Sequence, residues 1–287
     1  MKYGAVFPQI EYPSDPIAIR DYAQAVEAMG YDYLLVYDHI LGANPERPGG
    51  WHGPYTFKDP FQEPFVLFGY LAGLTQRLEL VTGILILPQR ETALVAKQAA
   101  QVDVLSGGRL RLGVGIGWNE VEYEAMNFSF RNRGKRIEEQ IDVLRRLWTE
   151  PLVKFDSQWH HINDAGINPM PVQRPIPIWF GGGADVVLQR MARIGDGWMP
   201  NSMSLDTARE LVDKLHGFLD AEGRDPSTFG IDTRLNVRTT PEPEWQHFLD
   251  AWRSMGATYV GVNTMGLGFT SPDQHLDVLR RFREAVR

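Results

Sequence analysis

Short apolar runs alternate along the chain with longer segments of helical period. The first unit shows the pattern, since the apolar run 3–7 is followed by a segment, 16–29, in which apolar residues recur every three or four positions. That spacing places side chains on one face of a helix. Asp15 and Pro16 are typical of a helix start, and Gly30 of a helix end. The pattern predicts a strand followed by a helix.

Seven more units of this kind follow. The expected strands span 33–37, 78–87, 110–114, 177–180, 197–199, 230–237 and 258–263. The expected helices span 64–75, 91–105, 134–149, 184–194, 205–221, 243–255 and 271–286. Alternation alone also allows an open doubly wound sheet. Because eight units close a parallel barrel, the count favours an α/β fold of the (β/α)8 TIM-barrel class.

Two segments do not fit the repeating units. Residues 41–63, after the second strand, are rich in Pro, Gly and aromatic residues, and residues 151–175 form an excursion before the fifth strand. No linker or low-complexity stretch divides the chain. We therefore expect one domain over 1–287 with two insertions. The 41–63 loop is either a substrate lid or a packing surface, and the pattern leaves both open.

Composition and charge narrow the class of protein. The chain has 287 residues, with 29 Lys and Arg against 36 Asp and Glu, and a formal net charge of −7. This balance argues against partners such as nucleic acid or an anionic membrane. The absence of cysteine excludes thiolate nucleophiles and iron–sulfur clusters. Met1 leads straight into a strand, without a signal peptide or a membrane-spanning run, so we expect a cytoplasmic protein.

Much of the glycine follows the ends of strands, where barrels of this class build their active sites. The positions are Gly83 in the third strand, Gly113, Gly115 and Gly117 after the fourth, and Gly181, Gly182 and Gly183 after the fifth. The triple glycine precedes a helix, which suits either an anion site or a tight turn. The fourth-strand glycines suit either a floor for a planar ring or a turn with positive φ. Gly83 indicates either a bulge or packing room.

His39 is the candidate general acid or base, because it follows a strand end and imidazole titrates near neutrality. A structural histidine is the alternative. His160 and His161 are neighbours on an extended segment and face opposite sides, so we expect no shared metal. The remaining histidines of the expected helices, which we expect to be exposed, are His216, His247 and His275. Hydrolase and nucleotide-loop motifs are missing, and a glycine-lined mouth therefore predicts an organic cofactor.

The chain resembles the luciferase-like monooxygenase superfamily. Within it, the resemblance is strongest to the branch that uses the deazaflavin coenzyme F420. The resemblance covers nearly the whole chain. It rests on 81–148, Tyr37-Asp38-His39, Pro175–Gly183 and Gly195-Asp-Gly-Trp198. It implies a (β/α)8 barrel with the flavin or deazaflavin ring in the barrel mouth.

The resemblance also implies roles for the matched residues. Asp38 and His39 correspond to a polar pair at the ring edge where the hydride is exchanged, with His39 catalytic. Gly83–Ile84 corresponds to a bulge with a cis non-proline peptide bond behind the ring. Gly181–Gly183 corresponds to the cofactor phosphate site. The full set of expected cofactor-binding residues is Asp38, Thr82, Gly83, Ile84, Gly115, Gly117, Gly181, Gly182 and Gly183.

One region departs from the pattern of the superfamily. Its sugar-phosphate dehydrogenases carry an acidic Glu after the fourth-strand glycines, where this chain has Trp118. Glu120 and Glu122 come later, and we expect them to face elsewhere. The departure argues against sugar-phosphate oxidation and favours an apolar or aromatic substrate beside Trp118. Gln9 and Trp51 are the other expected substrate contacts.

We therefore expect an F420-dependent oxidoreductase that transfers a hydride to or from a small organic substrate. The first alternative is an FMN-dependent monooxygenase that uses oxygen and a separate reductase. The second is a non-catalytic cofactor-binding protein, since fold does not determine function. The resemblance further implies a homodimer. No metal, nucleic acid or membrane is expected as a partner.

Overall fold

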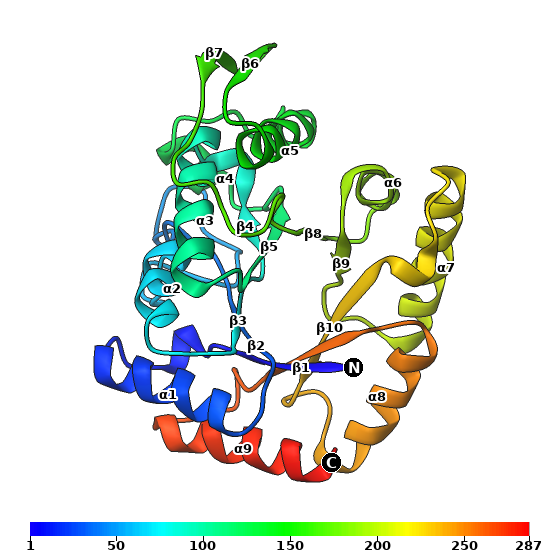
Figure 1. Ribbon diagram of the computed structural model, residues 1–287. Coiled ribbons are helices and arrows are strands. Elements are labelled where there is room, and N and C mark those ends of the chain that lie inside the picture. The colour runs from blue at the N-terminus through cyan, green and yellow to red at the C-terminus, as the bar shows by residue number, and fades with distance from the viewer. Residues whose placement is uncertain (287) are drawn as a thin grey trace.

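A computed structural model describes residues 1–286 and shows parallel strands closed into a ring, with helices around them (Figure 1). The strands are β1 (Lys2–Val6), β2 (Tyr33–Val36), β3 (Glu79–Thr82), β4 (Leu85–Ile86), β5 (Leu110–Gly115), β8 (Ile178–Gly181), β9 (Gly197–Met199), β10 (Gly230–Asn236) and β11 (Tyr259–Asn263). Their order is β3-β2-β1-β11-β10-β9-β8-β5, and β5 pairs back to β3. Because β4 continues β3, eight positions close the ring, and the (β/α)8 prediction is confirmed.

Within residues 1–286, eight main helices connect the strands, as the periodicity predicts. They are α1 (Pro16–Ala28), α2 (Pro64–Ala72), α3 (Thr92–Ser106), α5 (Arg133–Thr149), α6 (Asp185–Ile194), α7 (Leu205–Ala221), α8 (Trp245–Ser254) and α9 (Pro272–Ala285). Asp15 caps α1 by accepting a hydrogen bond from the N–H of Ala18, and Ser271 and Gln274 form a capping box on α9. Both start signals are confirmed. A short helix that the pattern did not predict, α4 (Glu120–Ala125), precedes α5.

The predicted strand 78–87 is interrupted at Gly83 and Ile84, between β3 and β4. The expectation of a cis peptide bond between Gly83 and Ile84 is wrong, since the cis bonds within residues 1–286 precede Pro169 and Pro175. Packing explains the glycine instead: a Cβ on Gly83 would lie 2.3 Å from Leu35 Cδ2. The chain therefore bends where Leu35 of the neighbouring strand needs room.

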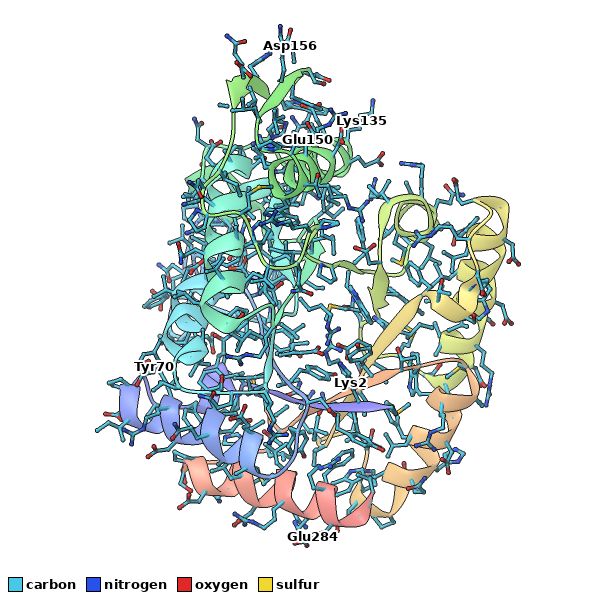
Figure 2. The ribbon with its side chains drawn as sticks, in the orientation of Figure 1. Lys2, Tyr70, Lys135, Glu150, Asp156 and Glu284 are labelled. Atoms are coloured by element: carbon cyan, nitrogen blue, oxygen red, sulfur yellow. The ribbon has the colours of Figure 1, made fainter. Side chains whose placement is uncertain are left out.

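The 151–175 insertion forms an antiparallel hairpin of β6 (Val153–Asp156) and β7 (His161–Ala165). Figure 2 shows Asp156 at its outer tip, far from Lys2 at the barrel. His160 is bound to Glu139 at 2.7 Å with 10% of its side chain exposed, whereas the His161 side chain is 71% exposed. The two histidines therefore face apart, as expected.

His275 corrects another expectation, because its residue is fully buried rather than exposed. Its Nδ1 lies 2.9 Å from the Thr264 hydroxyl, and its ring packs on Tyr12 and Phe269. Helix α9 turns this face toward the barrel, which a helical pattern of mixed polarity does not reveal. His247 is exposed as expected, and His216 is half-buried.

The barrel interior and the layer between strands and helices form two separate apolar clusters. The interior cluster consists of Val6, Tyr33, Leu35, Val81, Trp179, Met199 and Met265. Charged side chains from β5 and β10, namely Arg111, Asp232 and Arg234, lie beside it. None of the helices in residues 1–286 has the length and apolar character to cross a membrane.

Candidate active site at the carboxyl ends of the strands

A cavity of about 510 Å³ lies at the carboxyl ends of the barrel strands. Its lining includes His39, Asp38, Gly83, Ile84, Gly115, Gly117, Trp118, Gly181, Gly182 and Gly183, which the sequence predicts as site residues. Cofactor sites in proteins typically enclose about 300–1,000 Å³. The cavity is therefore large enough for a planar ring system, and the barrel brings most of the predicted residues to it.

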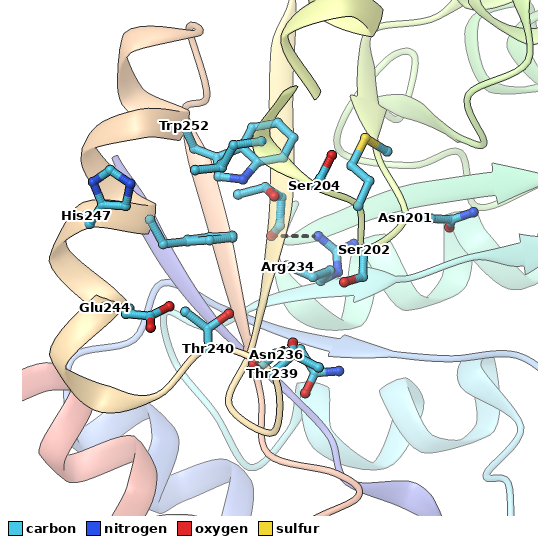
Figure 3. Close-up of a pocket in the computed structure, with 14 residues that line it drawn as sticks. Asn201, Ser202, Ser204, Arg234, Asn236, Thr239, Thr240, Glu244, His247 and Trp252 are labelled. Carbon is cyan, nitrogen blue, oxygen red and sulfur yellow. Dashed lines mark hydrogen bonds between the residues drawn. The ribbon is translucent and has the colours of Figure 1, made fainter. Parts of the chain in front are cut away.

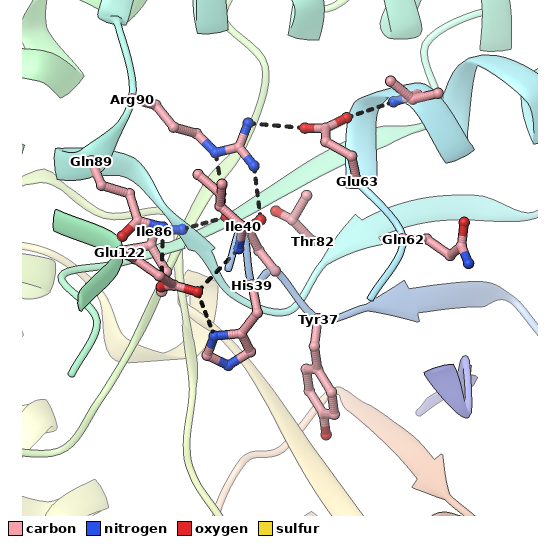
Figure 4. A network of polar contacts seen from close by, with 12 residues as sticks. Tyr37, His39, Ile40, Gln62, Glu63, Thr82, Ile86, Gln89, Arg90 and Glu122 are labelled. Atoms are coloured by element: carbon pink, nitrogen blue, oxygen red, sulfur yellow. Dashed lines mark hydrogen bonds and ion pairs between the residues drawn. The ribbon is translucent and has the colours of Figure 1, made fainter. Parts of the chain in front are cut away.

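His39 is held by a buried carboxylate that the sequence analysis did not assign to the site (Figure 4). Glu122, in α4, lies with Oε1 3.0 Å from His39 Nδ1, and its side chain is 1% exposed. The same oxygen accepts the backbone N–H groups of Ile40 at 3.0 Å and Leu41 at 3.4 Å. The expectation that Glu122 faces elsewhere is wrong, because the first turn of α4 directs it back toward the end of β2.

This arrangement determines which nitrogen carries the hydrogen in a neutral His39. Glu122 Oε1 already accepts two backbone N–H groups, so His39 Nδ1 must be the donor in their contact. A neutral His39 then carries its lone pair on Nε2, which points away from Glu122 in Figure 4. A carboxylate behind an imidazole fixes its tautomer and stabilises the imidazolium. The geometry suits a general acid or base acting through Nε2.

Asp38 has a structural partner rather than a free carboxylate. Its Oδ1 accepts from Arg90 Nη2 at 2.7 Å, and its Oδ2 accepts from the N–H of Ile86 at 3.0 Å. Arg90 also binds Glu63 at 2.9 Å. Burial raises the pKa of Asp38, and the Arg90 guanidinium opposes that rise. Asp38 lines the cavity, but its main contacts join β2 to the turn after β4.

The glycines of β5 and β8 make room for one side chain. A Cβ on Gly115 would lie 2.8 Å from Ile84 Cγ2, and one on Gly181 would lie 2.7 Å from Ile84 Cγ1. Gly117 has a φ of 63° and lies over Ile86. The floor of the cavity is therefore an apolar ridge, Ile84, seated between two glycines.

The loop before α6 presents backbone groups to the cavity. Gly182 has a φ of 103°, and its carbonyl accepts from Trp198 Nε1 at 2.6 Å, which explains the tryptophan of the Gly195–Trp198 motif. Ala184, at the N-cap of α6, makes no side-chain capping bond. The first N–H groups of this ten-residue helix are thus available to an anion. Together with the apolar floor, this fits a flavin-like cofactor with a phosphate group.

Aromatic side chains from the 41–63 loop surround His39. The rings of Tyr55 and Phe61 lie 5.0 and 4.8 Å from the imidazole, measured between centroids. Trp118, 44% exposed, lies 5.6 Å from His39 and 5.7 Å from Trp51. The loop thus forms a wall of the site, and Trp51 supports Trp118 from outside the cavity.

Besides Trp51, two other predicted site residues lie away from the cavity. Gln9 is buried at the start of η1 (Gln9–Glu11), where its amide donates to the Tyr37 carbonyl and accepts from the N–H of Gln62. Thr82 is fully buried, and its hydroxyl donates to the Gly113 carbonyl at 2.7 Å. Both side chains join neighbouring strands or loops, so their hydrogen-bonding groups are already used.

Other lining residues were missed by the sequence analysis. Tyr37, Arg234, Asn236 and Asn263 stand at the ends of β2, β10 and β11 and line the cavity. Their signal was polarity at strand ends, but it is shared by many surface residues. Within residues 1–286, no three His, Asp or Glu side chains meet as a metal site.

Comparison with known proteins defines the class to which this site belongs. The model of the luciferase-like monooxygenase family matches residues 4–285. An uncharacterized protein of Mycobacterium tuberculosis is 38% identical over 208 residues, covering 70% of this chain and 71% of the relative. The F420-dependent glucose-6-phosphate dehydrogenase of Amycolatopsis mediterranei is 29% identical over 245 residues, covering 83% and 69%. The chain belongs to the luciferase-like monooxygenase family.

The fold comparison agrees with this assignment. An F420-dependent secondary alcohol dehydrogenase, solved with an F420-acetone adduct, superposes with a TM-score of 0.79 at 18% identity and covers 100% of this chain and 99% of its own. At that identity the likeness concerns the fold. Family and relatives together identify the protein as an enzyme of the oxidoreductase class.

Proposed function

We propose that this protein is an F420-dependent oxidoreductase that exchanges a hydride with a small organic substrate. The observation that carries the proposal is the His39–Glu122 pair, which faces a cavity with an apolar floor and an uncapped helix N-terminus. The relative from Amycolatopsis mediterranei, named as F420-dependent, supports the choice of cofactor.

The residues of the cavity divide the work between binding and proton transfer. The Gly181–Gly183 loop and the start of α6 would hold the phosphate of the cofactor, and Ile84 would lie against its ring. Bound F420 supplies or accepts the hydride. His39 holds the accompanying proton at Nε2, while Glu122 orients the ring and balances the charge of the imidazolium. The aromatic wall of Tyr55, Phe61 and Trp118 limits access of water.

Titration of the purified protein with each cofactor tests the proposal. We expect quenching of deazaflavin fluorescence at micromolar protein and much weaker binding of FMN. An FMN-dependent monooxygenase is the second candidate, because the matching family is described as luciferase-like monooxygenases and a riboflavin lyase of the same fold was solved with modified FMN. Tight FMN binding with oxygen consumption in the presence of a flavin reductase would favour it and contradict the proposal.

Replacement of His39 tests the assigned proton transfer. His39→Ala should lower turnover by roughly 100-fold or more, because general acid–base catalysis contributes about 10²–10⁴-fold. Cofactor affinity should stay nearly unchanged. His161→Ala is the matched control, since the His161 side chain is 71% exposed on the hairpin. Unchanged turnover in His39→Ala would refute the role, and binding without turnover over a broad substrate panel would indicate a cofactor carrier.

A further inference from the structure

A second cavity adjoins the first on the side of β10. It encloses about 400 Å³ between the loop after β9 and the face of α8 (Figure 3). The two cavities share four lining residues, Asn201, Ser202, Arg234 and Asn236. A molecule that lies in the first cavity can therefore extend past Arg234 into the second, which we call the side chamber.

A series of alternating charges runs from the exposed Lys2 through the barrel interior and ends at the side chamber. Lys2 binds Glu79 at 2.5 Å, and Glu79 lies 3.5 Å from Arg111. Arg111 binds Asp232 at 2.9 Å, and Asp232 binds Arg234 at 2.6 Å. The series contains three cations and two carboxylates and therefore one more positive than negative charge. Its last cation, Arg234, lines both cavities.

Arg234 is held rigidly, which prepares it for a ligand. Its Nη1 donates to the Asp232 side chain and to the carbonyls of Asp232 and Thr233. Only 9% of its side chain is exposed. A guanidinium that is already ordered loses little conformational freedom on binding an oxyanion, and its planar donors match carboxylate and phosphate groups.

The start of a helix also lines the side chamber. The N-terminus of α7, seventeen residues long, adds its positive end through Ser204 and Leu205. Trp252 lines the chamber as well, but its indole Nε1 is itself buried away from the open space. Glu244, also at the chamber, is exposed, so water screens its charge.

We propose that the side chamber binds an anionic oxygen group, a carboxylate or a phosphate, of the substrate. The group would accept from Arg234, near the N-terminus of α7, while the reacting part of the substrate lies beside His39. The statement that the anion belongs to a substrate rests on the proposed function. The statement that an anion binds at Arg234 does not rest on it. The substrate class then becomes organic acids or phosphate esters rather than purely apolar molecules.

Calorimetric titration with inorganic phosphate tests the site itself. Protein saturated with F420 has its glycine loop filled, so the remaining phosphate site should be the side chamber. We expect millimolar binding by the wild type, a loss of tenfold or more in Arg234→Met, and partial retention in Arg234→Lys. Equal binding by wild type and Arg234→Met, or no binding by wild type, would overturn the proposal. Without cofactor, two phosphate sites are expected and Arg234→Met should lose one.

A second variant avoids disturbing the buried ion pairs. Ser202 is exposed and lines both cavities, so Ser202→Asp adds a negative charge without touching Asp232. Ser202→Asp should abolish phosphate binding in the chamber, while its thermal unfolding temperature stays near that of the wild type. Ser202→Asn introduces a neutral side chain of nearly the same size as Asp and should keep phosphate binding. Equal phosphate affinity in both variants would contradict the proposal.

Turnover distinguishes a substrate anion from an anionic group of the cofactor. Carbonyl compounds that carry a carboxylate are compared with their methyl esters. The wild type should prefer the acids by tenfold or more in kcat/KM, and Arg234→Met should lose that preference while binding F420 normally. If Arg234→Met weakens F420 instead, the anion belongs to the cofactor and the assignment to the substrate is wrong. Failure of the wild type to bind F420 would refute the proposed function but leave the phosphate titration of the cofactor-free protein as the test of the Arg234 site.

Discussion

Replacing Glu122 with Gln tests how the fold prepares His39. The Glu122 side chain is buried, and one of its oxygens accepts from His39 Nδ1 and from the N–H groups of Ile40 and Leu41. Its other oxygen lies 3.4 Å from Gln89 Nε2. Glutamine keeps the shape and an acceptor oxygen. It removes the negative charge that stabilises an imidazolium and replaces the long 3.4 Å acceptor contact with Gln89 by an NH2 group.

The size of the effect follows from these contacts. Hydrogen bonds with a charged partner contribute about 1.5–3 kcal/mol, against about 0.5–1.5 kcal/mol for neutral ones. Since the acceptor oxygen remains, we expect Glu122→Gln to lower the free energy of unfolding by about 1–3 kcal/mol. The activation barrier should rise by about 2.7 kcal/mol, which is a loss of about 100-fold in kcat. Cofactor affinity should change less than about twofold, because Glu122 acts through His39.

The assay measures kcat and KM separately, together with deazaflavin binding and urea unfolding. Nitrogen-15 spectra of the His39 ring give a readout that needs no substrate, since loss of the carboxylate changes the hydrogen bond at Nδ1. Glu120→Gln is the matched control, because Glu120 is exposed in the same short helix. A folded Glu122→Gln enzyme within threefold of the wild-type kcat would refute the reasoning, whatever its stability.

Three further changes test other parts of the structure. Gly181→Ala places a Cβ 2.7 Å from Ile84 Cγ1 in the cavity and should weaken cofactor binding about tenfold in the titration. The control is Gly217→Ala in α7, where the new Cβ has no atom within 4 Å. This change should raise the free energy of unfolding by about 0.5–1 kcal/mol. Asp38→Asn removes the buried partner of Arg90 and leaves Glu63, 36% exposed, as its remaining carboxylate, so it should cost about 3 kcal/mol in urea unfolding; a change below about 1 kcal/mol would contradict the buried ion pair. Burial lowers the pKa of His275 to about 4 from 6.5, so the unfolded chain protonates first. The contribution of His275 to the free energy of unfolding should be constant above pH 6.5 and should decline as the pH falls toward 4. His275→Gln should flatten this decline when denaturation is measured at a series of pH values.

The architecture was open to prediction because its signals are local. The start of α1 depends on Asp15 and a proline beside it, and the start of α9 on Ser271 and Gln274. The apolar spacing of each helix is read within a few turns. The break at Gly83 was also visible as a glycine in an apolar strand, but its cause, the room needed by Leu35, involves another strand.

The barrel, the glycines at the strand ends and the place of His39 after a strand can all be inferred from the amino-acid sequence alone. The partners of these residues depend on the closed barrel. Glu122 reaches His39 across 83 positions of the chain, and Arg111 reaches Asp232 across 121. Periodicity and capping depend on neighbours along the backbone, whereas a buried charge takes its partner from whichever strand or loop the closed barrel brings beside it. Such pairs become visible only when the ring has closed.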